Sequence, residues 1–208
     1  MLDEDQVEAL VPVQIRALSA AQIGAFEPST LATFSSSDIA AIQNKALPGL
    51  GADALAALTT GQIMALTTGQ ISALKPTQIS ALDTEQVEAL TPAQVKALNA
   101  AQLAALSPDA LATFSTADLA ALNNRAVTGI GSAALAELSP DQIGAISPAA
   151  LAGFTAAQIR AMSALQIDAL SPAQMAALTS SHLAAMDPAI LAELSPELLG
   201  AISGKAIA

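Results

Sequence analysis

The sequence predicts an all-α fold, a solenoid (superhelix) of about 26 very short capped helices with one helix in each eight-residue repeat. Three observations predict it. Apolar residues recur every eight positions along all 208 residues, without an insertion or a deletion. Most octads open with a residue that favours helix N-termini, and strong helix formers such as Ala, Gln and Leu follow. Because 208 is 26 times eight, residues 1–208 are expected to form a single octapeptide-repeat solenoid.

Each octad, counted from Asp3, carries two large apolar residues three positions apart. Ile63 and Leu66 are one such pair, and Ile71 and Leu74 are the next. This spacing places both residues on one face of a helix. Burial of two such side chains contributes roughly 3–6 kcal/mol, whereas ordering the backbone of eight residues costs about 8–16 kcal/mol. An octad is therefore not stable alone, and the apolar columns of successive octads are expected to share one continuous interior.

The start of each helix is marked in the sequence. Twenty of the 26 octads begin with Ser, Thr, Asp or Asn, and ten of the 11 prolines come next, at the first helical position. Gln often follows three residues after the cap, as in Thr91–Gln94 and Ser171–Gln174, which is the pattern of a capping box. The sequence therefore predicts a new helix in every octad.

A single long helix does not fit this pattern. Eight residues advance about 800°, so an apolar stripe would rotate by about 80° per octad, and the recurrent prolines would break the helix. A β-solenoid is the remaining alternative. The abundance of Ala and Gln, with Thr confined mainly to the caps, favours short helices over it.

A second, longer period of ten octads lies over the first. Residues 31–58 and 111–138 are identical at 16 of 28 positions, and a third copy of this super-repeat starts near residue 191. The octad consensus alone does not explain the shared Asp, Asn, basic and Gly residues. We interpret the chain as a fragment of a longer array of such super-repeats.

Octads 43–50 and 123–130, here called the corner octads, depart from the consensus because they lack the Gln and contain a basic residue. Their glycines and the glycines that follow are expected to permit positive φ at a corner: Gly49, Gly51, Gly129 and Gly131. Two interpretations remain open. The favoured one is a structural correction that restores the superhelical register. The other is a periodic docking point for a partner, at Asn44, Lys45, Asn124 and Arg125.

Composition excludes several classes of function. The chain has no Cys, which excludes disulfides, thiolate chemistry and Cys-ligated metals. Its net charge is −11 with seven scattered Lys and Arg, so no nucleic-acid partner is expected. No run of about 20 apolar residues occurs, so no transmembrane segment is expected. The acidic N-terminal residues do not resemble a signal peptide. We expect no cofactor and no metal site.

Few side chains are candidates for chemistry, and each has a structural explanation. His182, the one histidine, occupies the Gln column and is interpreted as a substitute for Gln. The Gln column looks like a recognition ladder, but capping explains it more simply. The acidic cluster 3–5 lacks the spacing of a calcium loop, and the runs Thr59–Gly61 and Thr67–Gly69 are too few for a regular ice-binding row. The chain is therefore not expected to be an enzyme.

The repeats at Leu66–Leu74 (LTTGQISAL) and Leu90–Leu98 (LTPAQVKAL) resemble two families. LTPAQV is similar to the first helix of transcription-activator-like effector repeats, but this acidic chain lacks their second helix and base-reading loop. The whole chain more closely resembles tandem LTxxQIxAL octapeptide-repeat arrays of large bacterial secreted or surface proteins of the adhesin type. That resemblance implies a stalk, spacer or adhesive segment in an extracellular or cell-surface location.

We therefore expect a non-enzymatic structural spacer or interaction scaffold. The alternative is a ligand- or protein-binding repeat module that uses the corner octads. The expected partners are proteins or further copies of the chain, bound through the repeat surface or through the exposed ends of the solenoid.

Overall fold

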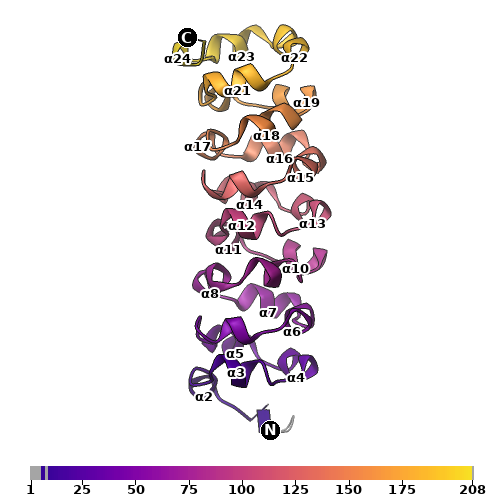
Figure 1. The fold of residues 1–208 in the computed structure, drawn as a ribbon, viewed down its shortest axis with the longest axis vertical. Coiled ribbons are helices and arrows are strands. Elements are labelled where there is room, and N and C mark those ends of the chain that lie inside the picture. Colours follow the sequence, from indigo (N-terminus) through magenta and orange to yellow (C-terminus); the bar gives the residue numbers. More distant parts are fainter. Residues whose placement is uncertain (1–5, 8, 208) are drawn as a thin grey trace. The chain divides into compact units, whose positions relative to one another are not determined.

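The computed structural model describes residues 6–7 and 9–207, apart from the side chains of Lys205 and Ile207. It forms two compact units, Met1–Leu98 and Asn99–Ala208. From residue 11 onward every octad contains one helical element, and no strand occurs in the described residues (Figure 1). The predicted all-α class is confirmed.

The elements follow one another with short connections. Unit Met1–Leu98 contains α2 (Pro12–Ile15), α3 (Ala20–Ile23), α4 (Pro28–Ala32), α5 (Ser36–Ala41), η1 (Leu47–Gly49), α6 (Ala52–Ala56), α7 (Thr60–Ala65), α8 (Thr68–Ala73), α9 (Pro76–Ile79), α10 (Thr84–Glu88) and α11 (Pro92–Ala97). Unit Asn99–Ala208 contains α12 (Ala100–Leu103), α13 (Pro108–Ala112), α14 (Thr116–Ala121), η2 (Ala126–Gly129), α15 (Ser132–Glu137), α16 (Pro140–Ala145), α17 (Pro148–Leu151), α18 (Ala156–Ala161), α19 (Ala164–Asp168), α20 (Pro172–Ala176), α21 (Ser180–Ala185), α22 (Pro188–Glu193), α23 (Pro196–Ala201) and α24 (Gly204–Ile207).

The helices begin at the capping boxes that the sequence predicts. At the start of α8, the Gln70 N–H donates to Thr67 Oγ1 at 3.2 Å, and the Thr67 N–H donates to Gln70 Oε1 at 2.7 Å. Ser171 and Gln174 form the same reciprocal pair at α20, with proline at the first helical position. Each pair satisfies two backbone donors that would otherwise lack a partner.

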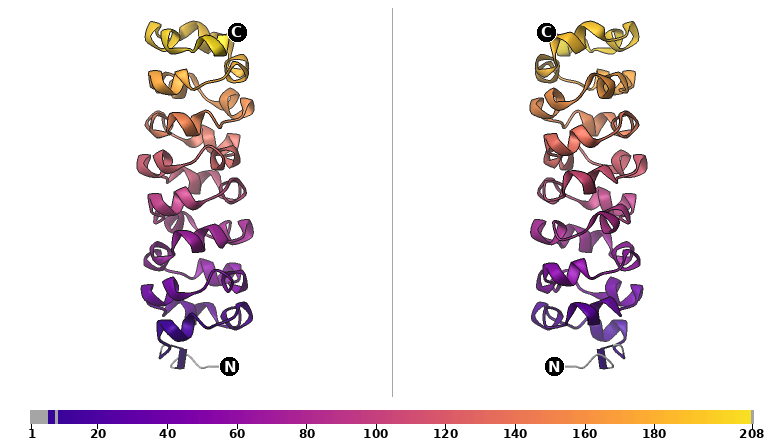
Figure 2. Two further views of the ribbon diagram at one scale, coloured as in Figure 1. Left: turned by 90° about the vertical axis from the view of Figure 1, so that its left-hand side faces the viewer. Right: turned by 90° about the vertical axis from the view of Figure 1, so that its right-hand side faces the viewer.

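Many helices end where the second apolar residue of the octad adopts extended backbone. Leu74, directly after α8, has φ −65° and ψ 140°, and the next cap residue, Lys75, has φ −73° and ψ 153°. Two extended residues turn the chain before the next helix starts (Figure 2). In the described residues no glycine or other residue has a positive φ. The change of direction therefore needs no left-handed residue.

The two apolar columns form the interior of each unit, as predicted. Ile63 and Ile71 have no exposed surface, and Leu66 and Leu74 are also buried. The columns continue through the second unit, where Leu119, Leu135 and Ile143 are fully buried. Most helices place their apolar face inward, whereas the first three positions of the octads are mainly exposed.

Helices three octads apart pack against each other, which makes each unit a solenoid. In the first unit α2 packs on α5, α5 on α7 and α7 on α10. In the second unit α14 packs on α16 and α16 on α19. Side-chain hydrogen bonds reach one octad further, to residues 28 and 31 positions earlier. One turn of the coil therefore takes more than three octads and fewer than four.

The corner octads differ from the prediction in two ways. They contain the 3₁₀ elements η1 and η2 in place of α-helices. Their glycines are not at positive φ, so the proposed conformational role is wrong. The physical reason for Gly49 is close packing, because a Cβ on Gly49 would lie 1.9 Å from the carbonyl oxygen of Ala20. Gly129 meets Ala100 in the same way, at 1.9 Å.

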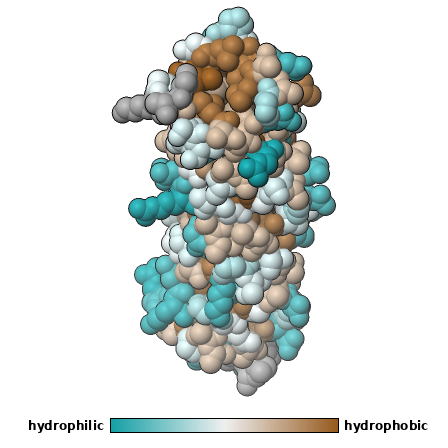
Figure 3. All heavy atoms as spheres, turned by 45° about the horizontal axis from the view of Figure 1, so that its top comes forward, coloured by the Kyte–Doolittle hydropathy of each residue, from teal (hydrophilic) through white to brown (hydrophobic). Residues whose placement is uncertain are grey.

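The surface mixes polar and small apolar residues. On the face shown in Figure 3, strongly apolar residues gather at the end formed by α22–α24, where the Leu199 side chain is exposed. Within the described residues no helix combines the length and the apolar character that a membrane crossing requires.

Candidate functional site

The Gln side chains at the fourth octad position form a buried ladder, here called the Gln ladder. The members that donate to the preceding turn are Gln62, Gln70, Gln78, Gln86 and Gln94 in the first unit, and Gln142, Gln158, Gln166 and Gln174 in the second, all buried except the half-buried Gln142. Gln70 is typical. Its Nε2 donates to the carbonyl oxygens of Ile39 at 2.7 Å and Ile42 at 2.8 Å. These carbonyls lie at the end of α5, where a helix leaves acceptors without intrahelical donors.

The capping interpretation of these Gln residues is confirmed but incomplete. One amide joins two turns, because its oxygen caps its own helix and its nitrogen satisfies the end of a helix on the turn before. The sequence contained a signal for this second role. A capping box accepts Glu as readily as Gln, yet no octad has Glu at this position. A carboxylate lacks the N–H donors that reach the preceding turn.

The buried polar residues of this column include two that are not Gln, His182 and Asp118. His182 Nδ1 accepts from the Thr179 N–H at 3.3 Å, and its Nε2 lies 2.7 Å from the carbonyl oxygen of Phe154. An imidazole protonated at Nε2 makes both bonds, so the interpretation of His182 as a Gln substitute is confirmed. Asp118 accepts the Ser115 N–H at 2.9 Å through Oδ2, but its buried Oδ1 has no hydrogen-bond partner. Asp118 therefore caps its helix, but no bond from it to the preceding turn forms in the described residues.

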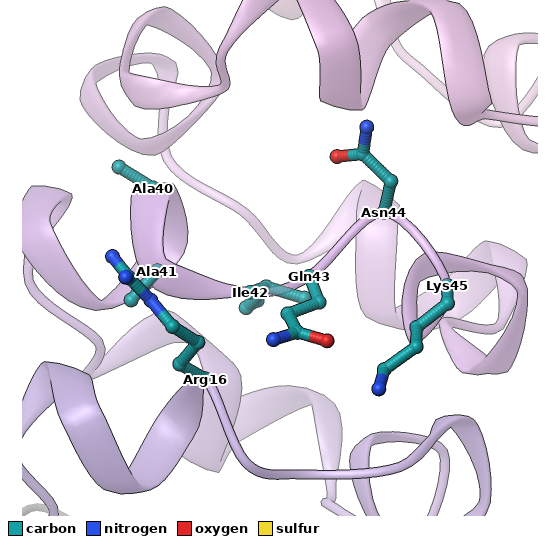
Figure 4. A pocket seen from close by; sticks show the side chains of 7 residues that line it. All are labelled: Arg16, Ala40, Ala41, Ile42, Gln43, Asn44 and Lys45. Carbon is teal, nitrogen blue, oxygen red and sulfur yellow. The ribbon is translucent and has the colours of Figure 1, made fainter.

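The first corner octad lies beside an open hollow of about 500 Å³. Arg16, Ala40, Ala41, Ile42, Gln43, Asn44 and Lys45 line it (Figure 4). The structure therefore brings the predicted residues Asn44 and Lys45 together with Arg16, which follows α2 and was not predicted. In the view of Figure 4, Gln43 lies between Arg16 and Lys45, whereas the Asn44 side chain points away from them.

Neighbouring turns hold this octad in place. Gln70 donates to the carbonyl oxygen of Ile42, directly before the octad, and Gln78 donates to the carbonyls of Leu47 and Leu50 at 2.8 Å each. Asn44 faces α8, because a Cβ on Gly69 would lie 3.1 Å from Asn44 Nδ2. Asn44 is exposed but lies next to Gly69 of the neighbouring turn, and Lys45 is the predicted residue that carries a charge at the hollow.

The second corner octad is shaped by a side chain of its own, Asn123. Asn123 Oδ1 accepts the N–H groups of Arg125 at 3.0 Å and Ala126 at 2.9 Å, which starts η2. The backbone at Asn124 lies against Gly153, where a Cβ would approach the Asn124 carbonyl oxygen to 2.1 Å. Asn124 and Arg125 are exposed. Here too, Gly allows close contact between backbones.

The remaining candidates from the sequence are the acidic cluster 3–5 and the two TTG runs. The acidic cluster 3–5 lies outside the described residues, and within the part that is described no group of acidic residues and His is arranged to hold a metal ion. Thr59 and Thr67 of the two TTG runs are helix N-caps. Their hydroxyls accept the N–H groups of Gln62 and Gln70 at 3.2 Å each.

Fold and packing define an octad-repeat α-solenoid whose turns are joined by the Gln ladder. The family model of the ALTTAQ repeat matches four segments, residues 31–68, 64–99, 111–148 and 143–180. These matches cover about two thirds of the chain, so the chain belongs to the ALTTAQ repeat family. The first and third matches begin at residues 31 and 111, where the first two super-repeats begin. No curated protein matches the chain.

Proposed function

We propose that the chain is a non-catalytic scaffold or spacer, part of a large secreted or surface protein of a bacterium. Membership in a repeat family is compatible with such a role. The bacterial and extracellular parts of the proposal rest on the resemblance to octapeptide arrays of large adhesin-type proteins. The absence of Cys is compatible with export.

The observation that carries the proposal is the double use of each Gln in the ladder. Gln62, for example, caps α7 through Oε1 and donates from Nε2 to Leu31 and Phe34 on the preceding turn, at 2.9 and 2.8 Å. The bonds are buried, so water does not compete for them. A coil joined in this way at successive octads resists bending between turns, which is the property that a spacer needs.

Groups that an enzyme would use are engaged in structural bonds here. His182 joins two turns, and Ser171 and Ser139 cap helices. Nucleophilic catalysis needs a hydroxyl next to a base that is free to accept its proton. These bonds support the non-catalytic proposal.

A distance measurement between two spin labels tests the rigidity of the first unit. Glu27 and Glu88 are exposed, and the chain has no Cys, so Glu27→Cys and Glu88→Cys provide two unique labelling sites. Double electron–electron resonance is expected to give one narrow distance distribution, as wide as the rotamers of the labels alone produce. A distribution spread over several nanometres would contradict a rigid scaffold.

A second candidate function is partner binding at the corner octads, because the surface is hollowed between Arg16 and Lys45. Further copies of the chain are a second kind of partner, bound through the apolar end at α22–α24 (Figure 3). Light scattering over a range of protein concentrations tests self-association. A monomer at every concentration would exclude it.

A further inference from the structure

We infer that the hollow at corner octad 43–50 binds the carboxylates of an acidic peptide segment of a partner protein, with Arg16 and Lys45 as the charged contacts. This inference rests on the second function proposed above, and it names the chemistry of the partner. It is independent of the rigidity on which the scaffold proposal depends.

Within the described residues, the two cations at the hollow have no acidic partner. Arg16 and Lys45 are exposed, and neither forms an ion pair within 4.0 Å in the part of the chain that the structure describes. The chain has 18 acidic residues against seven basic ones, so acidic side chains are not scarce. Both charges beside the hollow are therefore available to an anion supplied from outside.

The basic residues follow the coil from turn to turn. Arg16 and Lys45 have the same separation in sequence as Ala20 and Gly49, whose backbones are in contact across one turn. Lys75 lies on the turn after Lys45, and its Nζ lies 3.5 Å from the carbonyl oxygen of Pro48 in the corner octad. The three cations therefore belong to successive turns and form a basic row, Arg16, Lys45 and Lys75, that crosses the coil.

The residue types at the hollow recur in the sequence with the period of the super-repeat. Ala40 to Lys45 read AAIQNK, and residues 120–125 read AALNNR. Arg16 is matched by Lys96, which lies one super-repeat of ten octads later. Each of these positions keeps its apolar, amide or basic character in the second copy. The two basic positions, those of Arg16 and Lys45, account for four of the seven basic residues of the chain. The position of Lys45 is basic in all three copies, as Arg125 and Lys205, whereas the position of Arg16 is basic again at Lys96 and is Ala176 one period later. A requirement for positive charge explains the recurrence at the position of Lys45, whereas octad packing does not.

The arrangement favours an extended peptide over other anions. A basic row spread over successive turns matches carboxylates spaced along a chain better than it matches one small ion. A nucleic acid is disfavoured, since its dense phosphates would be repelled by a net charge of −11. Single strands also need aromatic platforms, and the chain has no Trp or Tyr while Phe34, Phe114 and Phe154 are buried.

The arginine side chains provide a direct test by NMR. The chain has three arginines, Arg16, Arg125 and Arg160. In the Arg125→Gln background only two Nε–Hε signals remain, one at the hollow and one on α18, where Arg160 is exposed. Titration with a peptide of six Glu at constant ionic strength is expected to shift the Arg16 signal and to leave the Arg160 signal unchanged. A peptide of six Ser is the matched ligand control.

Charge removal sets the quantitative expectation. Lys45→Gln should weaken binding, read from Arg16, about threefold, and Lys45→Gln with Lys75→Gln should weaken it about tenfold. The equally charged control Arg160→Gln should have no effect. Circular dichroism and the label distance are expected to be unchanged in all variants, because these side chains are exposed.

Three results would overturn the inference. The first is equal binding by the wild type and the Lys45→Gln/Lys75→Gln variant, and the second is an equal shift of Arg16 and Arg160. The third is binding of inorganic phosphate as tight as that of the Glu peptide, since this would identify a site for a small ion. None of them affects the scaffold proposal, which fails only if the distance distribution is broad.

Discussion

The most specific prediction concerns Gln70→Glu, which replaces the NH₂ group of one Gln in the ladder by an oxygen atom. The capping half of the interaction survives, since a Glu carboxylate accepts the Thr67 N–H as the amide oxygen does at 2.7 Å. The inter-turn half is lost. An acceptor oxygen replaces the amide nitrogen that donates to Ile39 and Ile42 at 2.7 and 2.8 Å.

The expected loss of stability follows from burial. Each lost hydrogen bond costs about 0.5–1.5 kcal/mol net, and an uncompensated buried charge raises the cost to about 3–5 kcal/mol. Gln70 is 1% exposed, so water cannot replace the missing donors. We expect Gln70→Glu to lower the free energy of unfolding of the first unit by about 3–5 kcal/mol.

Gln22→Glu is the matched control. Gln22 caps α3 through Oε1, which accepts the Ser19 N–H at 2.9 Å, but it is exposed and bonds to no preceding turn in the described part of the chain. Its replacement should change stability by less than about 0.5 kcal/mol. Urea denaturation followed by far-ultraviolet circular dichroism measures both variants, since the chain has no Trp or Tyr for fluorescence. Equal losses in the two variants would refute the inter-turn role.

Three further predictions use the same denaturation assay. Gly49→Ala should cost about 1–3 kcal/mol because its Cβ would meet backbone at 1.9 Å. Gly61→Ala, inside α7 and with no atom closer to its Cβ than 3.9 Å, should be neutral or slightly stabilising. Similar losses in the two variants would contradict the packing role of Gly49. His182→Gln should retain stability, and His182→Ala should lose about 1–3 kcal/mol; an unaffected Ala variant would show that the ring bonds contribute nothing. Deletion of octad 67–74 should leave a cooperative, helical protein, whereas deletion of residues 67–70 should shift every later octad out of register with the turn before it. Equal loss of helicity in the two deletions would count against the octad solenoid.

The local elements were predictable because short-range interactions define them. A cap such as Thr67, the Gln three residues later and the Ile–Leu pair all lie within one octad. The candidate site was predictable only in part. Lys45 was identified because it breaks the octad consensus, but Arg16 lies on the preceding turn of the coil and was not identified. Nothing within its own octad marks it as part of a site.

The sequence by itself determined the helix starts, the buried face and the all-α class, because each depends on residues within about eight positions of one another. The tertiary structure decided what those elements meet. One turn of the coil takes more than three and fewer than four octads, and this number determines which residues face each other. Side-chain packing between helices determines the number. This geometry directs the amide of Gln70 to Ile42, makes Gly49 necessary against Ala20 and places Arg16 beside Lys45.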